Sequence, residues 1–190
     1  MYFHASNTGG IEILEPRVSN HNKPLIYFSE KRENVLVYLS NAVEKFCRET
    51  EFNHKGKWHK WASYGFEPDG ILRYDEYYPN ALWDTYKGVS GYIYSAENVI
   101  INEDSINISN AVTSSLPVKV TGVEFVEDAY EEILKAEEAG LIKIRRFEDM
   151  SENVLLWIEK TIKAEYENAE NEPDYRHFLK GKFGFLEKMA

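Results

Sequence analysis

The sequence predicts an α+β fold built around a mixed, largely antiparallel sheet. Strand-like and helical stretches alternate irregularly along the chain, whereas a doubly wound fold alternates them regularly. The short strand-like stretches also gather in two groups. With 190 residues, of which 43% are hydrophobic, the chain is long and apolar enough for one compact domain with its own core.

The first predicted strand spans residues 1–6 and opens with aromatic residues around a histidine. Because side chains alternate along a strand, His4 and Ser6 point to one face. Phe3 and Ala5 point to the other. Phe3 can therefore anchor the strand in the core while His4 and Ser6 face a cleft. The alternative is an N-terminal edge strand whose histidine is merely solvated or packed.

Four further stretches are predicted strands. Residues 25–29 are almost continuously apolar, as in a buried strand. The segment 117–125 alternates apolar and polar residues, which is typical of a half-exposed strand. Residues 91–95 and 141–144 complete the set.

Helical spacing is predicted in four places. Apolar residues between 35 and 46 form one stripe of an amphipathic helix. Residues 129–139 form a second helix, which Gly140 closes in the usual C-terminal capping position. Ser151 caps a third, long helix, and Pro173 begins the last helical segment.

The segment 48–88 is rich in aromatic residues but follows neither the helical nor the strand period. Disordered segments are poor in aromatic residues, so a disordered linker is excluded. We expect an insertion of short strands and turns, which is a stacking surface for a planar ligand, a lid over a site or a small satellite core. The predicted organisation is one domain over residues 1–150, including this insertion, and a C-terminal helical extension over 151–190.

Charge and cysteine content exclude several classes of partner and compartment. The formal net charge is −10, so the surface is expected to repel polyphosphate backbones, and no nucleic acid is predicted as a partner. No apolar run approaches the length of about 20 residues that a membrane span needs. No charged segment followed by an apolar one opens the chain, so no secretory signal is expected. The single cysteine, Cys47, fits a reducing cytoplasm.

No metal site is predicted from the histidines. His54 and His59 are close in sequence, but no carboxylate or cysteine pair completes a zinc-ligand spacing. The glycine signatures of phosphate and dinucleotide loops are also missing.

One constellation in the sequence suits chemistry at a sugar carbon. It comprises His4 on the first strand, Tyr27 on the second and the acidic pair Glu103–Asp104 after a later strand. A histidine can hold ribose hydroxyls, a tyrosine ring can stack on a leaving heteroaromatic ring, and a carboxylate can stabilise a cationic transition state. Taken alone, such an acidic pair is more often part of a turn.

The order of these stretches resembles the ADP-ribosyltransferase fold, and most closely the small bacterial rifamycin ADP-ribosyltransferases. The strand at 2–6, Tyr-Phe-His-Ala-Ser, is similar to the family's tyrosine-histidine-glycine-threonine strand. The strands at 25–29 and 91–94 resemble its aromatic strand and its glycine-x-isoleucine-tyrosine strand. The acidic pair and the strand at 117–123 then follow in the family's order.

The resemblance implies a split sheet with flanking helices and an enzyme that uses NAD as a substrate. His4 looks like the ribose-binding histidine, and Tyr27 looks like the nicotinamide-stacking tyrosine. Asp104 looks like the catalytic acid, with Glu103 as the less favoured choice. His4, Tyr27 and Asp104 are thus the expected catalytic residues. The residues expected to bind NAD are His4, Ala5, Ser6, Tyr27 and Ser29.

Departures from the family pattern bear mainly on the acceptor of ADP-ribose. The resemblance covers roughly residues 1–47 and 88–148, and alanine and serine replace the glycine and threonine that follow His4. The segment 48–88 is longer than the family pattern predicts, and the tail from residue 151 has no counterpart. The expected acceptor is therefore an unidentified small molecule or protein and not rifamycin.

Two alternatives stay open. One is a non-catalytic interaction module on the same fold, with the segment 48–88 as its partner-binding surface. The other is RNA 2'-phosphotransferase chemistry, which also uses NAD but needs a basic pocket, and the acidic charge balance speaks against it. Side chains of His4, Tyr27 and Asp104 that meet in one cleft would favour the enzyme. Side chains on different faces would favour the module.

Overall fold

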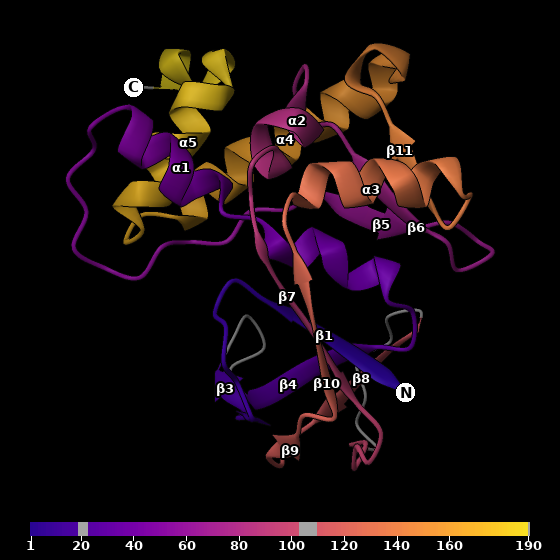
Figure 1. Ribbon diagram of the computed structural model, residues 1–190. Coiled ribbons are helices and arrows are strands. Elements are labelled where there is room, and N and C mark those ends of the chain that lie inside the picture. The colour runs from indigo at the N-terminus through magenta and orange to yellow at the C-terminus, as the bar shows by residue number, and fades with distance from the viewer. Residues whose placement is uncertain (19–22, 103–109, 190) are drawn as a thin grey trace.

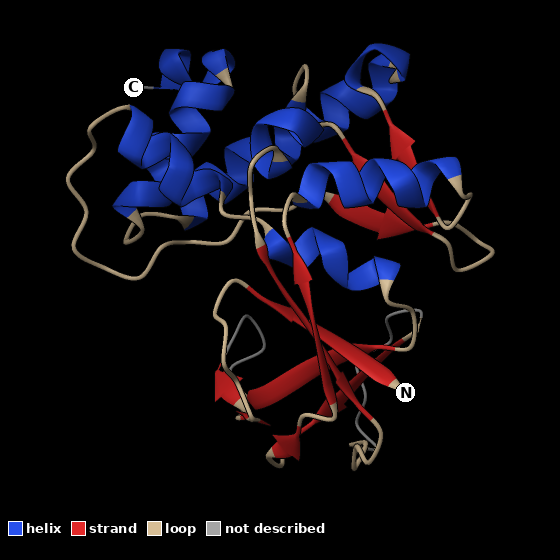
Figure 2. Ribbon diagram, viewed as in Figure 1, coloured by secondary structure: helices blue, strands red, loops and turns tan. Residues whose placement is uncertain are grey.

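The structure of the protein, a computed structural model, describes residues 1–18, 23–102 and 110–189 (Figure 1). Within these residues the chain forms a six-stranded sheet, two smaller sheets and a group of helices. Figure 2 shows the six-stranded sheet in the lower part of the view and most of the helices above it. The predicted α+β architecture with antiparallel sheets and C-terminal helices is confirmed.

The six-stranded sheet has the first strand in its middle. Its order is β10–β7–β1–β4–β3, β8 also pairs with β4, and all pairings are antiparallel. Because β1 is bonded on both sides, the alternative of an N-terminal edge strand is wrong. The strands are β1 Tyr2–Ser6, β3 Arg17–Val18, β4 Pro24–Ser29, β7 Gly91–Ala96, β8 Ala111–Ser114 and β10 Gly122–Val126.

A three-stranded sheet uses two strands of the aromatic segment. β6 (Leu72–Asp75) lies between β11 (Ile142–Arg145), which is parallel to it, and β5 (Tyr64–Phe66), which is antiparallel. The same segment also contains the short helix α2, Ala81–Tyr86. The expectation of short strands and turns over residues 48–88 therefore holds for residues 64–75, and a short helix follows them.

The predicted strand at 117–125 is divided into two strands that have different partners. β9 (Val118–Lys119) pairs antiparallel with β2 (Ile13–Leu14), whereas β10 pairs with β7. At the break, the backbone N–H of Thr121 already donates to the carbonyl of Ser95 in β7, at 2.8 Å. The alternation of apolar and polar residues continues through this break. The sequence pattern therefore gives no sign that the pairing strand changes from β2 to β7.

The predicted helix at 35–46 is two helices. The 3₁₀ helix η1 spans Glu33–Leu39, and α1 spans Ala42–Glu49. Ser40 between them has an extended backbone, with φ −52° and ψ 136°, which interrupts the helical hydrogen bonds. Leu39 is buried in one core and Val43 in another, so the apolar stripe serves two cores.

The helix predicted at 129–139 is found at Ala129–Glu138, and the last two α-helices begin where Ser151 and Pro173 predict. The Asp128 side chain caps the first of them, and Gly140 follows it with φ +71°, a conformation that favours glycine. Ser151 stands at the cap of the long helix, but its side chain makes no capping hydrogen bond. The elements are α3 Ala129–Glu138, η2 Phe147–Asp149, α4 Glu152–Asn168, α5 Pro173–Lys182 and η3 Gly184–Met189.

The aromatic segment and the C-terminal helices share a hydrophobic core with α1. Trp61 and Tyr78 of the segment pack in this cluster with Ile162 of α4 and Phe178 of α5. A separate cluster fills the space between η1, α3 and the two larger sheets. The helices that the structure describes are all too short or too polar to span a bilayer.

Candidate functional site

The two faces of β1 have different surroundings. Phe3 and Ala5 point into the core that contains η1. On the opposite face the His4 ring meets Phe28 edge-on, with ring centroids 6.0 Å apart and planes at 61°. His4 therefore lies on the face of the sheet that is covered by the segment after β1.

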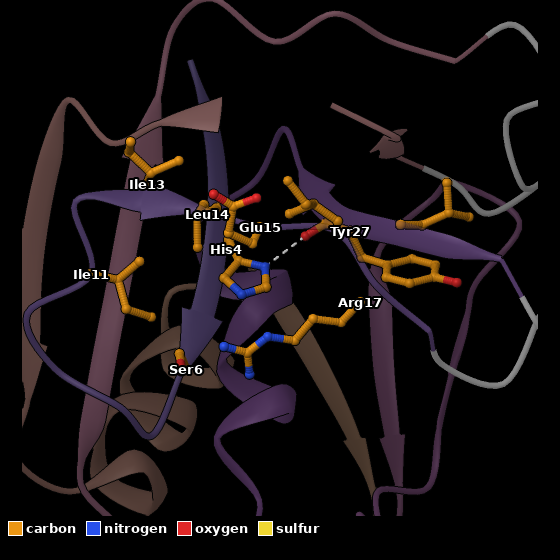
Figure 3. Close-up of a pocket in the computed structure, with 10 residues that line it drawn as sticks. His4, Ser6, Ile11, Ile13, Leu14, Glu15, Arg17 and Tyr27 are labelled. Carbon is orange, nitrogen blue, oxygen red and sulfur yellow. Dashed lines mark hydrogen bonds between the residues drawn. The ribbon is translucent and has the colours of Figure 1, made fainter. Parts of the chain in front are cut away.

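His4 lines a pocket of about 210 Å³ between the sheet and residues 11–17 (Figure 3). Half of its lining residues are aliphatic. A site of this size accommodates one sugar or one ring, since drug-sized ligands occupy about 300 Å³ or more. The lining residues are His4, Ser6, Ile11, Ile13, Leu14, Glu15, Arg17, Leu25, Ile26 and Tyr27.

Hydrogen bonding and burial fix the state of the His4 ring. Its Nδ1 lies 2.9 Å from the main-chain carbonyl oxygen of Tyr27. Because a carbonyl oxygen only accepts, Nδ1 carries the hydrogen, and Nε2 of the neutral ring is an acceptor. Burial lowers the pKa of His4, the Tyr27 bond opposes this shift, and the charge of Arg17 adds to it. At neutral pH, His4 is therefore an uncharged imidazole with an acceptor at Nε2.

Arg17 supplies positive charge to the same pocket. Its guanidinium lies beside the His4 ring (Figure 3). Glu15 also lines the pocket, but within the described part of the chain Arg17 forms no ion pair. A guanidinium that forms no direct ion pair with a described residue suits a phosphate or carboxylate, which it can bind through two parallel hydrogen bonds.

The sheet itself holds the loop that leads from β1 into the pocket wall. The Tyr94 hydroxyl donates to the carbonyl of Thr8 at 2.8 Å and accepts from the N–H of Ile11 at 3.3 Å. Gly9 lies so close to Tyr92 that an added Cβ would be 2.6 Å from its ring. Glycine at this position allows the loop to lie flat on the sheet.

Tyr27 contributes its main chain to the pocket, while its ring belongs to the other face. Phe3 pairs with Ser29 in the antiparallel register, so these two residues share a face. Tyr27 is two residues from Ser29 and therefore shares that face as well. Figure 3 shows its ring pointing away from His4.

Tyr27 belongs instead to a group of tyrosines beside η1. The Tyr38 and Tyr64 hydroxyls lie 2.9 Å apart, with ring centroids at 5.6 Å and planes at 88°. Burial, the Tyr64 phenol and, more weakly, the Tyr27 phenol raise the pKa of Tyr38 well above its ordinary value. The Tyr38 phenol therefore stays neutral at physiological pH and can donate a hydrogen bond.

The other residues expected to bind NAD are distributed over both faces. Ser6 lines the pocket, and its hydroxyl accepts the N–H of Thr8 at 3.1 Å. Ala5 is buried in the core on the opposite face. Ser29 is also buried, and its hydroxyl accepts the N–H of Lys31 at 3.1 Å. The structure brings together His4, Ser6 and the Tyr27 backbone, but not the side chains of Ala5 and Ser29.

The expected acid lies outside the described residues. Asp104 and the less favoured Glu103 both fall between residues 102 and 110. Among the described residues, no three His, Cys, Asp or Glu side chains are grouped so that they could hold a metal ion.

Sequence reasoning missed the charged residues of the pocket, Glu15 and Arg17. Their signal is slight: two opposite charges flank Pro16 directly after the apolar run that ends at Leu14. Only the pairing of β3 with β4 brings Arg17 beside His4. When the chain was compared with protein-family models, curated proteins and solved structures, no match was found.

Proposed function

We propose that the protein is an NAD-dependent mono-ADP-ribosyltransferase-like enzyme, which transfers ADP-ribose to a small molecule or to a protein. The observation that carries the proposal is that one pocket contains both a neutral His4 and Arg17, which forms no ion pair with any described residue. The acceptor atom Nε2 suits a ribose hydroxyl, and the guanidinium suits an adjacent phosphate. A nucleotide carries both of these ligand groups, the ribose hydroxyl and the phosphate, close together.

The residues of the pocket fit one part of NAD and not the whole dinucleotide. The volume of about 210 Å³ suits a ribose with its phosphate. Tyr27 would stack on nicotinamide only on the opposite face of the sheet, where Tyr38 and Tyr64 also lie. In this proposal, His4 orients the ribose, Arg17 holds the phosphate, and the acid at 104 assists attack on the ribose carbon.

A non-catalytic binding module on the same fold is the second candidate. The observation that favours it is the placement of the His4 and Tyr27 side chains on opposite faces. A module of this kind would bind its partner through the aromatic segment 48–88 and would not cleave a nucleotide held at His4 and Arg17.

Thermal unfolding with and without NAD tests the binding step. NAD at a hundred times its Kd is expected to add about 2.7 kcal/mol to the free energy of unfolding. His4→Ala and Arg17→Gln are each expected to remove most of this increase. Arg48→Gln is the matched control, since Arg48 is exposed and pairs with Glu44 far from the pocket in sequence.

Release of nicotinamide separates the two candidates. An enzyme releases nicotinamide from NAD in the presence of an acceptor, or slowly to water, and a binding module does not. Unchanged unfolding of the wild-type protein at millimolar NAD would contradict the enzyme.

A further inference from the structure

A second pocket, of about 220 Å³, lies between the aromatic segment and the C-terminal helices. Its lining includes the aromatic side chains of Trp61, Tyr64, Tyr77 and Tyr175 and the carboxylate of Glu165. Glu165 belongs to α4, Tyr175 to α5, and the other three to the segment before α2. The pocket therefore belongs to the two parts of the chain that the family resemblance does not cover.

The aromatic rings of this pocket meet at angles. The Trp61 ring lies 6.0 Å from that of Tyr77, with planes at 78°, and 6.3 Å from that of Tyr175, with planes at 45°. The aromatic surface continues beyond the pocket to Trp157, which is 53% exposed and lies edge-on to Tyr77 at 6.0 Å. Trp61 and Tyr175 are almost wholly buried. It is therefore mainly the half-buried rings of Tyr64 and Tyr77 that are open to a ligand.

Glu165 adds a carboxylate that has no cationic partner among the described residues. The Tyr175 hydroxyl donates to it over 3.4 Å, a long hydrogen bond. Burial and then the Glu165 charge raise the pKa of Tyr175, so that its phenol stays protonated beside the acid. The negative charge in this pocket is thus balanced only weakly by the protein.

Lys60 also lines the pocket, but its ammonium is already bonded elsewhere. It donates to the carbonyl of Ser40 at 2.8 Å and to the side-chain oxygen of Asn7. These partners lie at the end of η1 and just after β1, so Lys60 is directed toward the large sheet. It does not neutralise Glu165.

We propose that this pocket binds a small organic cation of the alkylated ammonium type. The faces of tryptophan and tyrosine attract such cations, and the carboxylate supplies the counter-charge. A cavity of about 150 Å³ holds benzene, so this volume accepts a trimethylammonium group with a short tail. The two pockets share no lining residue, so this inference does not depend on NAD binding.

Calorimetric titration with choline tests the proposal, with 3,3-dimethylbutan-1-ol as its uncharged isostere. Both probes have the same shape and differ only in the charge of the central atom. Choline is expected to bind at least about tenfold more tightly, because only the cation gains from the aromatic faces and the carboxylate. Equal affinity for the two probes, or no binding of choline, would overturn the proposal.

Substitutions locate the binding and test its chemistry. Glu165→Gln keeps the shape of an exposed side chain and is expected to weaken choline binding about tenfold. Tyr77→Phe keeps the ring and retains binding, whereas Tyr77→Leu loses most of it. Glu167→Gln, an exposed change on the same helix, is the matched control and leaves the affinity unchanged. Equal effects of the two glutamate substitutions would also overturn the proposal.

Discussion

A single main-chain bond decides the chemistry of His4. The Tyr27 carbonyl requires a hydrogen on Nδ1, so the ring can act at Nε2 only as an acceptor while it is neutral. Burial in a partly apolar pocket disfavours the charged ring and lowers the pKa of His4, and the nearby charge of Arg17 adds to this effect. The residue is suited to orienting a hydroxyl group and not to carrying positive charge.

The lowered pKa of His4 predicts a pH-dependent contribution to stability. The folded state binds the proton more weakly than the unfolded chain, whose histidine pKa is 6.5. Stability is therefore fully present above that value and falls as the pH decreases below it. Urea unfolding between about pH 7 and pH 5 should show a loss of up to about 1.4 kcal/mol per pH unit from this residue.

The His4→Gln variant isolates this contribution. His177, whose pKa is also lowered by burial, adds to the pH dependence of both proteins and cancels in the comparison. The variant should lose less stability on acidification than the wild type. Identical pH dependence of the two proteins would contradict a neutral, buried His4.

At the scale of elements, the packing of α5 against α1 depends on one glycine. A Cβ at Gly181 would lie 2.0 Å from the Phe46 ring, closer than any real contact. Gly181→Ala should therefore destabilise the protein by about 1–3 kcal/mol, although alanine favours a helix by about 1 kcal/mol. Urea denaturation measures the difference in the free energy of unfolding.

Gly184 provides the control for this substitution. A Cβ there would meet nothing within 4 Å. Gly184→Ala is expected to leave stability within about 0.5 kcal/mol of the wild type. A neutral Gly181→Ala would mean that α1 and α5 are packed less closely than the structure describes.

Most elements could be predicted from the sequence because their signals are local. Gly140 marks the end of α3, and the apolar run at 25–29 marks β4. The break at Ser40 could not be predicted, since the apolar stripe continues across it into a different core. The break is caused by tertiary packing, and no periodic pattern of residues in the sequence reports it.

The candidate site was predictable only in part, for a related reason. Alternation along β1 correctly separates His4 from Ala5. Whether Tyr27 shares a face with His4 depends on the register between β1 and β4, and a shift of one residue exchanges the faces. Arg17 enters the pocket through a two-residue strand that is too short to show a pattern. The face that the Tyr27 ring occupies and the position of Arg17 both depend on pairing between segments that are distant in the sequence.

At the scale of the whole molecule, the C-terminal helices complete a core that the rest of the chain leaves open. Trp61, Tyr78 and Cys47 are buried together with residues of α4 and α5. A chain of residues 1–150 would expose this cluster to water. It should retain secondary structure but lose cooperative unfolding and bind a hydrophobic dye such as ANS.

Circular dichroism and urea titration of the 1–150 fragment check this expectation. The far-ultraviolet signal should persist, while the near-ultraviolet signal of the many aromatic residues should collapse. A fragment that unfolds in one sharp transition, with its near-ultraviolet signal intact, would show that α4 and α5 are dispensable for the fold.

The central position of β1 has a consequence for the timing of folding. Tyr2 pairs with Ala96, so one edge of β1 stays open until β7 emerges roughly ninety residues later. At ordinary rates of translation this takes on the order of ten seconds. During that interval β4 is the only one of the two native partners of β1 that is available. Any other exposed strand can then compete for the free edge of β1. The loop that leads from β1 into the pocket wall is therefore held in place only after Tyr94 of β7 has been made.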